Sequence, residues 1–211
     1  RDAAADIHPP GYYWLLKVWA SVWGTTPAAL RSLSALCGVL LVALVFVVAR
    51  RVSSDDRPVR LALLAALVAA LNPFQIYYSQ EARMYMLLAL EGAALFWLLL
   101  ALLAAQRAGA PASRLNLLAA GYACVAAAGL WTHYSFPILL AAAGLAWLID
   151  WLGAARRTDH AGAHFARFAT ANVAALLLFA PWLPTAWRQV TQWPQGGETV
   201  GAVAGLELTL R

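Results

Sequence analysis

The sequence predicts an all-α protein, a polytopic bundle of transmembrane helices, and three observations support this fold class. Of its 211 residues, 63% are hydrophobic and only 12% are charged, about half the roughly 25% of an average globular domain. The apolar residues form runs long enough, at about 1.5 Å per residue, to cross roughly 30 Å of hydrocarbon as helices. Short polar loops separate these runs. We expect one transmembrane domain with about six spans plus an interfacial helix and, because the chain begins with Arg1 rather than Met, a fragment of a larger module.

Residues 1–27 are expected to form an outer loop followed by a helix that lies on the membrane surface. Pro9 and Pro10 fix their own φ angles and bias the residue before them away from the helical region, so a helix can begin only after them. The run 12–23 is too short to span and is rich in Trp and Tyr, which prefer the level of the lipid headgroups. Thr26 then stands as an N-cap before Pro27, which predicts the start of the first span.

Six apolar runs between residues 28 and 187 are predicted to cross the membrane. The second is expected to continue from Leu71 through Asn72 and Pro73, and the sixth to be bent or broken by Pro181 and Pro184. Residues 153–167 are expected to form a polar loop, and residues 188–211 the start of an outer loop. The predicted spans cover residues 28–49, 61–71, 84–105, 115–131, 136–152 and 168–187.

A polar and aromatic stretch, residues 72–85 (NPFQIYYSQEARMY), differs from every other part of the chain. We call it the polar segment. Ser79 is expected to cap the helix that follows and to place Glu81 in its first turn, where the helix dipole favours a carboxylate. Arg83 can serve as an anchor to lipid headgroups. Polar groups gathered at this depth also mark substrate paths, so we expect the polar segment to form one wall of a site at the membrane surface.

The distribution of basic residues predicts the orientation of the chain, since Lys and Arg accumulate in short loops on the cytoplasmic side. One side receives Arg50, Arg51, Arg57, Arg60, Arg107, Arg114, Arg156, Arg157 and Arg167, and the other receives Arg1, Lys17, Arg31, Arg83 and Arg188. The polar segment, His8, His133 and the loop around Trp193 are therefore expected together on the outer face. We expect a bacterial inner (plasma) membrane protein whose site faces the periplasm or the extracellular space.

Residues outside the polar segment are candidates for the same site. Asp6 and His8 point the same way along an extended chain, and the His8 imidazole can orient a phosphate or a carboxylate, or ligate a metal. His133 and Tyr134 stand at a turn, where packing is the alternative to ligand contact. Arg31 lies at the outer end of the first span, where it either snorkels to the headgroups or pairs with the phosphate of a lipid carrier.

Two acidic residues within the spans support an alternative function. Glu91, expected near the middle of the membrane, should face protein, and Asp150, near the cytoplasmic end of its span, can reach water. They would be the working charges of a polytopic transporter or lipid flippase. Transporters show discontinuous helices in repeated halves, and the sequence has no internal repeat. A third interpretation, a non-catalytic membrane scaffold, leaves the polar segment unexplained.

Missing motifs exclude several other functions. The sequence has no Gly-rich phosphate loop, no nucleophile elbow and no Cys/His metal spacing, so we expect a substrate taken from the bilayer rather than a soluble nucleotide. Its basic residues form no aromatic-interleaved face, which excludes nucleic acid as a partner. Cys37 and Cys124 sit singly in apolar runs and act as small hydrophobes. No metal site is assigned, and a divalent cation is the one cofactor left open.

Four stretches resemble the family 39 glycosyltransferases, which are integral membrane enzymes of the GT-C fold and include protein mannosyltransferases and the lipid A aminoarabinose transferase. The stretches are DIHPPGYY at 6–13, ALRSLSALCGVL at 29–40, the polar segment at 72–85, and THY at 132–134. They follow in the same order over roughly the first 150 residues, and YSQEARMY within the polar segment is the specific string.

The resemblance implies transfer of a sugar from a polyprenyl-phosphate-linked donor to an acceptor glycan, lipid or protein on the outer side of the membrane. In the family, an acidic residue upstream of the Pro-Pro motif acts as the catalytic base. This chain begins after that position, and Asp6 is a weak candidate for the role. His8 stands where the aminoarabinose transferases have a lysine, which argues against that substrate.

The implied chemistry assigns roles to the candidate residues, because a departing phosphate needs cations beside it. Arg83, Arg31 and His8 are expected to meet the phosphate, with Glu81 orienting one of them. Tyrosines are expected to line the sugar pocket or the lipid groove. The complete set expected to bind donor phosphate or substrate is His8, Arg31, Glu81, Arg83, Tyr78, Tyr85, His133 and Tyr134, with Tyr77 beside it.

Overall fold

The computed structural model describes residues 8–53, 57–154 and 160–191, and every regular element in these ranges is helical. The elements are α1 Gly11–Trp23, α2 Pro27–Val52, α3 Pro58–Leu71, α4 Pro73–Ser79, α5 Tyr85–Arg107, α6 Ala112–Thr132, α7 Phe136–Ala154, α8 Ala161–Phe179, a 3-10 turn Ala180–Trp182, and α9 Leu183–Thr191. The predicted all-α class is confirmed.

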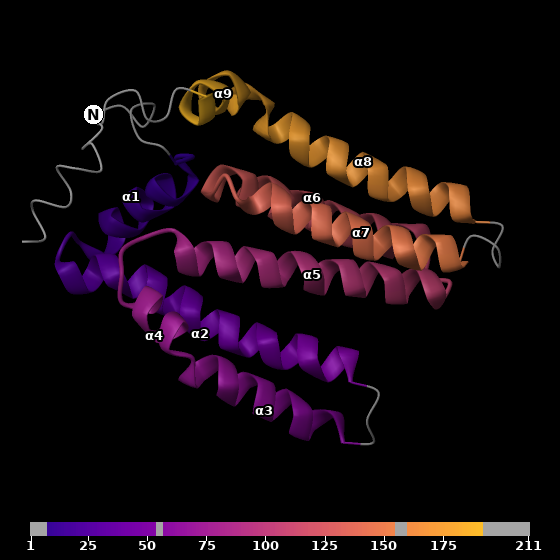
Figure 1. The fold of residues 1–211 in the computed structure, drawn as a ribbon, viewed down its shortest axis with the longest axis horizontal. Coiled ribbons are helices and arrows are strands. Elements are labelled where there is room, and N and C mark those ends of the chain that lie inside the picture. Colours follow the sequence, from indigo (N-terminus) through magenta and orange to yellow (C-terminus); the bar gives the residue numbers. More distant parts are fainter. Residues whose placement is uncertain (1–7, 54–56, 155–159, 192–211) are drawn as a thin grey trace, which may run out of the picture.

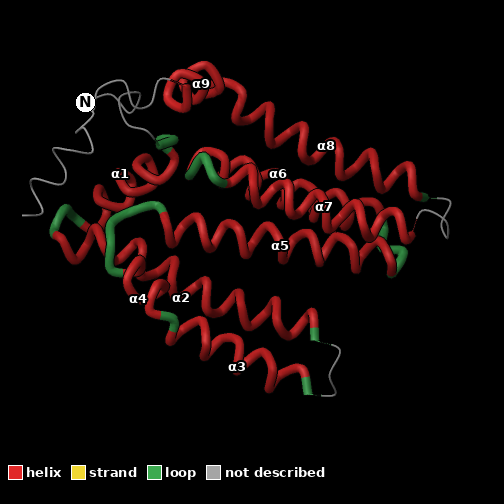
Figure 2. The backbone as a smooth tube through the Cα atoms, in the orientation of Figure 1, coloured by secondary structure: helices red, strands yellow, loops and turns green. Residues whose placement is uncertain are grey.

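The long helices lie side by side along one axis of the molecule, with successive helices running in opposite directions (Figure 1). Short loops join them, as Figure 2 shows. Within the described ranges, five segments are long and apolar enough to cross a membrane, namely α2, α5, α6, α7 and the stretch Ala161–Thr191. The bent pair of α3 and α4 makes a sixth if it is counted as one span. The chain is an integral membrane protein.

The short helix α1 packs against the bundle. It begins directly after Pro10, as the sequence predicts, and Tyr12 is only 1% exposed. Trp19 Nε1 donates to the Ala29 carbonyl oxygen at 3.0 Å. Gly11 packs so closely on α6 that an added Cβ would lie 2.5 Å from the Trp131 carbonyl oxygen. The start of α1 is thereby fixed beside the end of α6.

The first span begins where the sequence predicts. Thr26 Oγ1 accepts a hydrogen bond from the Ala29 backbone N–H at 3.2 Å, and Pro27 occupies the first helical position. Both features belong to a standard helix start.

The polar segment folds differently from the prediction. Asn72 ends α3 and caps α4, accepting a hydrogen bond from the Phe74 N–H at 2.9 Å, and the two helices meet at an angle of 59°. Ser79 is the last residue of α4 and donates to the Gln75 carbonyl oxygen at 2.6 Å. The expectation that Ser79 caps the next helix was wrong, because its hydroxyl bonds a carbonyl one turn back instead.

Glu81 consequently lies in a loop, not in the first turn of a helix, since α5 begins only at Tyr85. The short helix α4 folds back onto α2 at Gly38. Gln75 Nε2 donates to the Gly38 carbonyl oxygen at 3.2 Å, and Ser79 Oγ occupies the place that a side chain on Gly38 would take. This close approach places the loop between α4 and α5 next to the start of α1.

The last span also differs at its ends from the prediction. The expected loop 153–167 is shorter, because α8 already begins at Ala161 and includes His164 and Arg167. The expected break at the two prolines is confirmed as the 3-10 turn that separates α8 from α9. The helix α9 runs to Thr191, where an outer loop was expected from residue 188. The loop around Trp193 lies outside the described residues.

Three apolar clusters of described residues hold the bundle together, and the smallest joins the end of α5 to the start of α6 at Leu102, Ala105 and Leu115. The largest joins α5, α6, α7 and α8, with the Trp147 and Phe168 rings stacked at 4.3 Å between centroids. The absence of a side chain at Gly129 makes room for the Phe136 ring. The remaining cluster lies under α1 and contains Tyr12, Leu33, Cys37, Met84 and Met86. It fixes the loop before α5 against α1 and α2.

The two acidic residues within the spans occupy separate places. Thr132 Oγ1 donates to Glu91 Oε1 at 3.0 Å, so Glu91 faces protein as expected. It lies in the second turn of α5 beside the last residue of α6, and its depth in the membrane stays a prediction. Asp150 pairs with Arg107, which lies about 24 Å further along α5 at 1.5 Å per residue. Glu91 and Asp150 therefore share no common site.

Candidate functional site

Five aromatic rings from three separate parts of the chain meet at one end of the bundle. This end carries α1, α4 and α9 (Figure 1). Successive centroids are 5.2 Å apart for Tyr77 and Tyr78, 4.7 Å for Tyr78 and Tyr85, 6.3 Å for Tyr85 and His133, and 5.4 Å for His133 and His8. We call this row the aromatic ladder. It brings together four of the residues expected in the site, His8, Tyr78, Tyr85 and His133.

Arg83 and Glu81 lie in the loop beside the ladder. The Arg83 side chain is exposed, and Tyr85 and Glu81 raise the pKa of its guanidinium. Arg83 is therefore a permanent cation at the ladder. Glu81 lies close enough for its charge to raise the pKa values of both Tyr77 and Arg83, although Tyr85 acts most strongly on the guanidinium.

The backbone of this loop is tied to α1 and α2 by buried hydroxyls. Ser34 Oγ donates to the Arg83 carbonyl oxygen at 3.3 Å and lies 3.2 Å from the Tyr12 hydroxyl. Because the Ser34 proton is used toward Arg83, the Tyr12 hydroxyl is the donor in the second bond. Burial raises the pKa of Tyr12, which keeps this hydroxyl protonated. We call these two hydrogen bonds, from Tyr12 to Ser34 and from Ser34 to Arg83, the relay. The relay connects α1, α2 and the loop before α5.

The turn after α6 sets the protonation of His133. The Ser135 backbone N–H donates to His133 Nδ1 at 3.0 Å, and the Ser135 hydroxyl lies 2.8 Å from the same nitrogen. A backbone N–H can only donate, so Nδ1 is the acceptor and Nε2 carries the proton of the neutral ring. Burial, and then the neighbouring His8, lower the pKa of His133. At neutral pH it is an uncharged N–H donor.

Two other expected site residues do not join the ladder, and a third lies outside the described residues. Tyr134 accepts a hydrogen bond from Trp182 Nε1 at 3.0 Å and also bonds Gln189 on α9, so it ties the turn to α9. Arg31 is exposed in α2, with no hydrogen bond or ion pair to any residue that the structure describes. Asp6 lies outside the described residues.

Sequence reasoning missed the residues that hold the site in place. Ser34 is 1% exposed and stands among apolar neighbours, where a serine passes for a small helix residue. Ser135 fixes the His133 ring. Tyr13 interacts with Arg83 from α1. The pair Tyr12 and Tyr13, which follows the two prolines after Gly11, was the one signal that could have pointed to these contacts.

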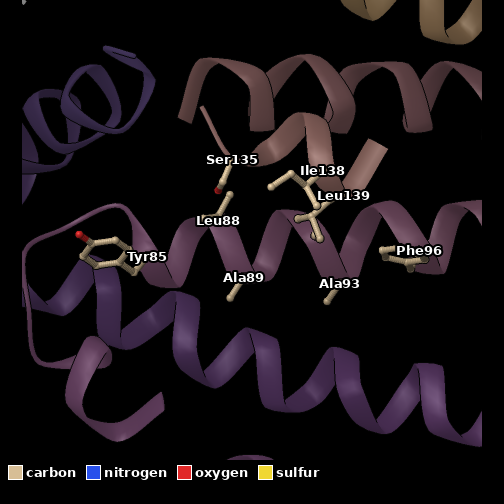
Figure 3. A pocket seen from close by; sticks show the side chains of 9 residues that line it. Tyr85, Leu88, Ala89, Ala93, Phe96, Ser135, Ile138 and Leu139 are labelled. Atoms are coloured by element: carbon tan, nitrogen blue, oxygen red, sulfur yellow. The ribbon is translucent and has the colours of Figure 1, made fainter. Parts of the chain in front are cut away.

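An apolar cavity of about 560 Å³ begins at the ladder. Tyr85 and Ser135 stand at one end of its lining, which continues along α5 to Phe96 and along α7 to Leu139 (Figure 3). A second apolar cavity of about 320 Å³ shares Ala93 and Phe96 and reaches Val52 on α2. The two cavities together form what we call the apolar groove, which leads from the polar site down the side of the bundle.

Among the described residues, no three His, Cys, Asp or Glu side chains are grouped so that they could hold a metal ion. The chemistry offered by the site comes from a guanidinium, imidazole and phenol groups, and one carboxylate.

The fold and the site define an integral membrane protein that presents a cationic and aromatic cluster at one end of its helical bundle, next to an apolar groove. The profile of the family described as dolichyl-phosphate-mannose-protein mannosyltransferase matches residues 7–185, and the chain belongs to this family. Neither a curated protein nor a solved structure matches the chain. The family membership expected from the four stretches is confirmed, and with it glycosyl transfer from a lipid-phosphate sugar donor.

Proposed function

We propose that the aromatic ladder and Arg83 form the donor site of an enzyme that moves a sugar, mannose by family membership, from a polyprenyl phosphate to an acceptor on the outer face of the membrane. The observation that carries this proposal is the position of Arg83, His8 and His133 beside Tyr85, where the apolar groove begins. Cations and N–H donors suit a phosphate, tyrosine rings suit a sugar, and an apolar groove suits an isoprenoid chain.

The proposed reaction displaces a phosphate from the anomeric carbon. An acceptor hydroxyl oxygen forms a bond to C1 as the bond from C1 to the phosphate oxygen breaks, and the electron pair of that bond leaves with the phosphate. Arg83 and the Nε2–H of His133 stabilise the charge that develops there. The hydroxyl proton passes to a base, for which the family points to an acidic residue upstream of the Pro-Pro motif, with Asp6 as the weak alternative.

The roles of the other expected residues follow from their contacts. Glu81 orients Arg83, and Tyr78 and Tyr85 line the sugar pocket. We assign the phosphate to Arg83 ahead of Arg31, because Arg31 makes no contact with the ladder. The isoprenoid chain lies along α5 between Leu88 and Phe96, where the groove is apolar. This places the scissile bond at the boundary between polar site and apolar groove.

A transfer assay tests the proposal. Full-length protein is reconstituted in liposomes with polyprenyl phosphate that carries labelled mannose, and incorporation into an acceptor is measured. Tyr85→Leu, which removes the ring, should lose most of the transfer, whereas Tyr85→Phe should keep most of it. The unfolding midpoint of each variant controls for misfolding. Movement of the labelled lipid across the bilayer without any transfer would favour the transporter or flippase alternative.

The proposed membrane side has its own test. In a background without Cys37 and Cys124, Gln80→Cys should react with a membrane-impermeant reagent from outside, and His160→Cys only from the cytoplasm. These positions lie at opposite ends of the bundle. Labelling of position 80 only from the cytoplasm contradicts an outer site.

A further inference from the structure

A third cavity, of about 440 Å³, lies at the end of the bundle opposite the aromatic ladder. It is formed where α5 ends and where α6 and α8 begin, at the right-hand end of the bundle in Figure 1. Its polar lining residues are Gln106, Arg107, His160, His164 and Arg167. The family reaction uses none of these residues, and α5 separates the cavity from the ladder by about 33 Å at 1.5 Å per residue.

The described lining of this cavity is basic. Two arginines and two histidines line it, and none of the described lining residues is acidic. Arg107 is paired with Asp150. Arg167 Nε donates to Asn116 Oδ1 at 2.9 Å, which fixes the guanidinium, and its terminal nitrogens make no hydrogen bond within the described part of the chain. The His160 and His164 rings are 6.5 Å apart. A metal ion would meet two cations here, whereas an anion would meet several donors.

Two helix starts add to the attraction for an anion. Both α6, after Pro111, and α8, after His160, begin at the cavity without a side-chain cap and without an acidic residue in the first turn. The first backbone N–H groups of a helix have no partner within it and carry the positive end of the helix dipole. Anions bind readily at such helix starts.

Gln106 also lines the cavity, but its Nε2 atom is buried within the cavity wall and has no hydrogen-bond partner among the described residues. An atom without accessible surface is out of reach of a ligand, so an anion here would be held by the accessible donors of Arg167, His164 and the two helix starts.

We propose that this cavity binds a phosphate group, held by Arg167, His164 and the starts of α6 and α8. The phosphate belongs either to the headgroup of an anionic phospholipid or to a small phosphate from solution. The cavity lies at the end that the basic residues predict to be cytoplasmic, where anionic lipids attract basic groups close to the membrane. The proposal does not depend on the donor site, because the two sites share no residue.

The test measures the unfolding midpoint of full-length protein in detergent at constant ionic strength. Three probes are titrated: dioctanoyl phosphatidylglycerol, the uncharged dioctanoyl glycerol, and inorganic phosphate. We expect saturable stabilisation by phosphatidylglycerol and none by dioctanoyl glycerol. Stabilisation by inorganic phosphate as well identifies a site for which phosphate alone suffices, and its absence identifies a lipid headgroup site. If neither phosphate probe stabilises the protein, the proposal is overturned.

Matched variants locate the effect. Arg167→Gln should weaken the apparent affinity at least about tenfold, as expected for loss of a charged hydrogen bond, and His164→Asn provides a second variant if Arg167→Gln does not fold. Arg51→Gln is the control, since Arg51 lies at the same end of the bundle but does not line the cavity. Equal affinity in Arg167→Gln, His164→Asn and the parent protein, or an equal loss in Arg51→Gln, overturns the proposed site.

Discussion

The relay of hydroxyls beneath Arg83 allows a prediction with a distinctive sign. Ser34→Ala removes the central hydroxyl and leaves two groups without partners, the Tyr12 hydroxyl and the Arg83 carbonyl. Each unpaired buried group costs about 1–3 kcal/mol, so we expect a destabilisation of about 2–6 kcal/mol for this variant. Tyr12→Phe leaves the bond from Ser34 to the Arg83 carbonyl intact and should cost only about 0.5–1.5 kcal/mol.

The double variant distinguishes a relay from two independent contacts. Once Ser34 is alanine, the Tyr12 hydroxyl is a buried donor without a partner, so removing it by Tyr12→Phe should restore about 1 kcal/mol or more. The assay is the unfolding of full-length protein in detergent micelles, followed by tryptophan fluorescence, with the transfer rate measured in parallel. Ser34→Ala should also slow transfer, because the Arg83 backbone loses its tie. A double variant whose destabilisation equals the sum of the two single values refutes the relay.

Two further predictions concern buried groups near the site. Glu91→Gln keeps an acceptor for Thr132 Oγ1, so the transfer rate should stay within about twofold of the parental rate. Glu91→Leu removes this acceptor and should lower the free energy of unfolding by about 1 kcal/mol. Strong loss of activity in Glu91→Gln would favour the transporter alternative. The lowered pKa of His133 implies stability that is complete above about pH 6.5 and is lost as the pH falls from there toward the pKa of the folded state. Unfolding midpoints between pH 7.5 and 5.5 should fall less in His133→Gln than in the parent, and equal slopes would contradict the shifted pKa.

The spans were predictable because hydropathy and length decide them in a membrane. The start of α2 at Thr26 and Pro27 and the break at Pro181 and Pro184 follow from local backbone chemistry, which sequence alone contains. The early start of α8 was missed. His164 and Arg167 are polar and look like loop residues, but a helix can extend beyond the apolar run when its polar turns reach water.

The site was predictable as a set of residues, but not as an arrangement. His8, Tyr85 and His133 were identified by their contrast with apolar surroundings, and they do meet. The role of Ser34 depends on residues far away in the sequence, which a local pattern does not reveal. Tyr134 was expected beside the substrate, and its bonds to Trp182 and Gln189 could be known only once α9 was placed.

The most direct test of the donor site is the single-turnover rate of Arg83→Lys in full-length protein with saturating polyprenyl-phosphate mannose. Lysine keeps the charge but cannot make the planar two-pronged contact of a guanidinium with phosphate oxygens. If that contact strengthens as the phosphate departs, the rate should fall roughly tenfold to hundredfold while the KM for the donor changes little. Arg51→Lys, at the other end of the bundle, should keep the parental rate. An Arg83→Lys variant that inserts, folds and transfers mannose at the parental rate would contradict the phosphate role of Arg83 and leave it a headgroup anchor.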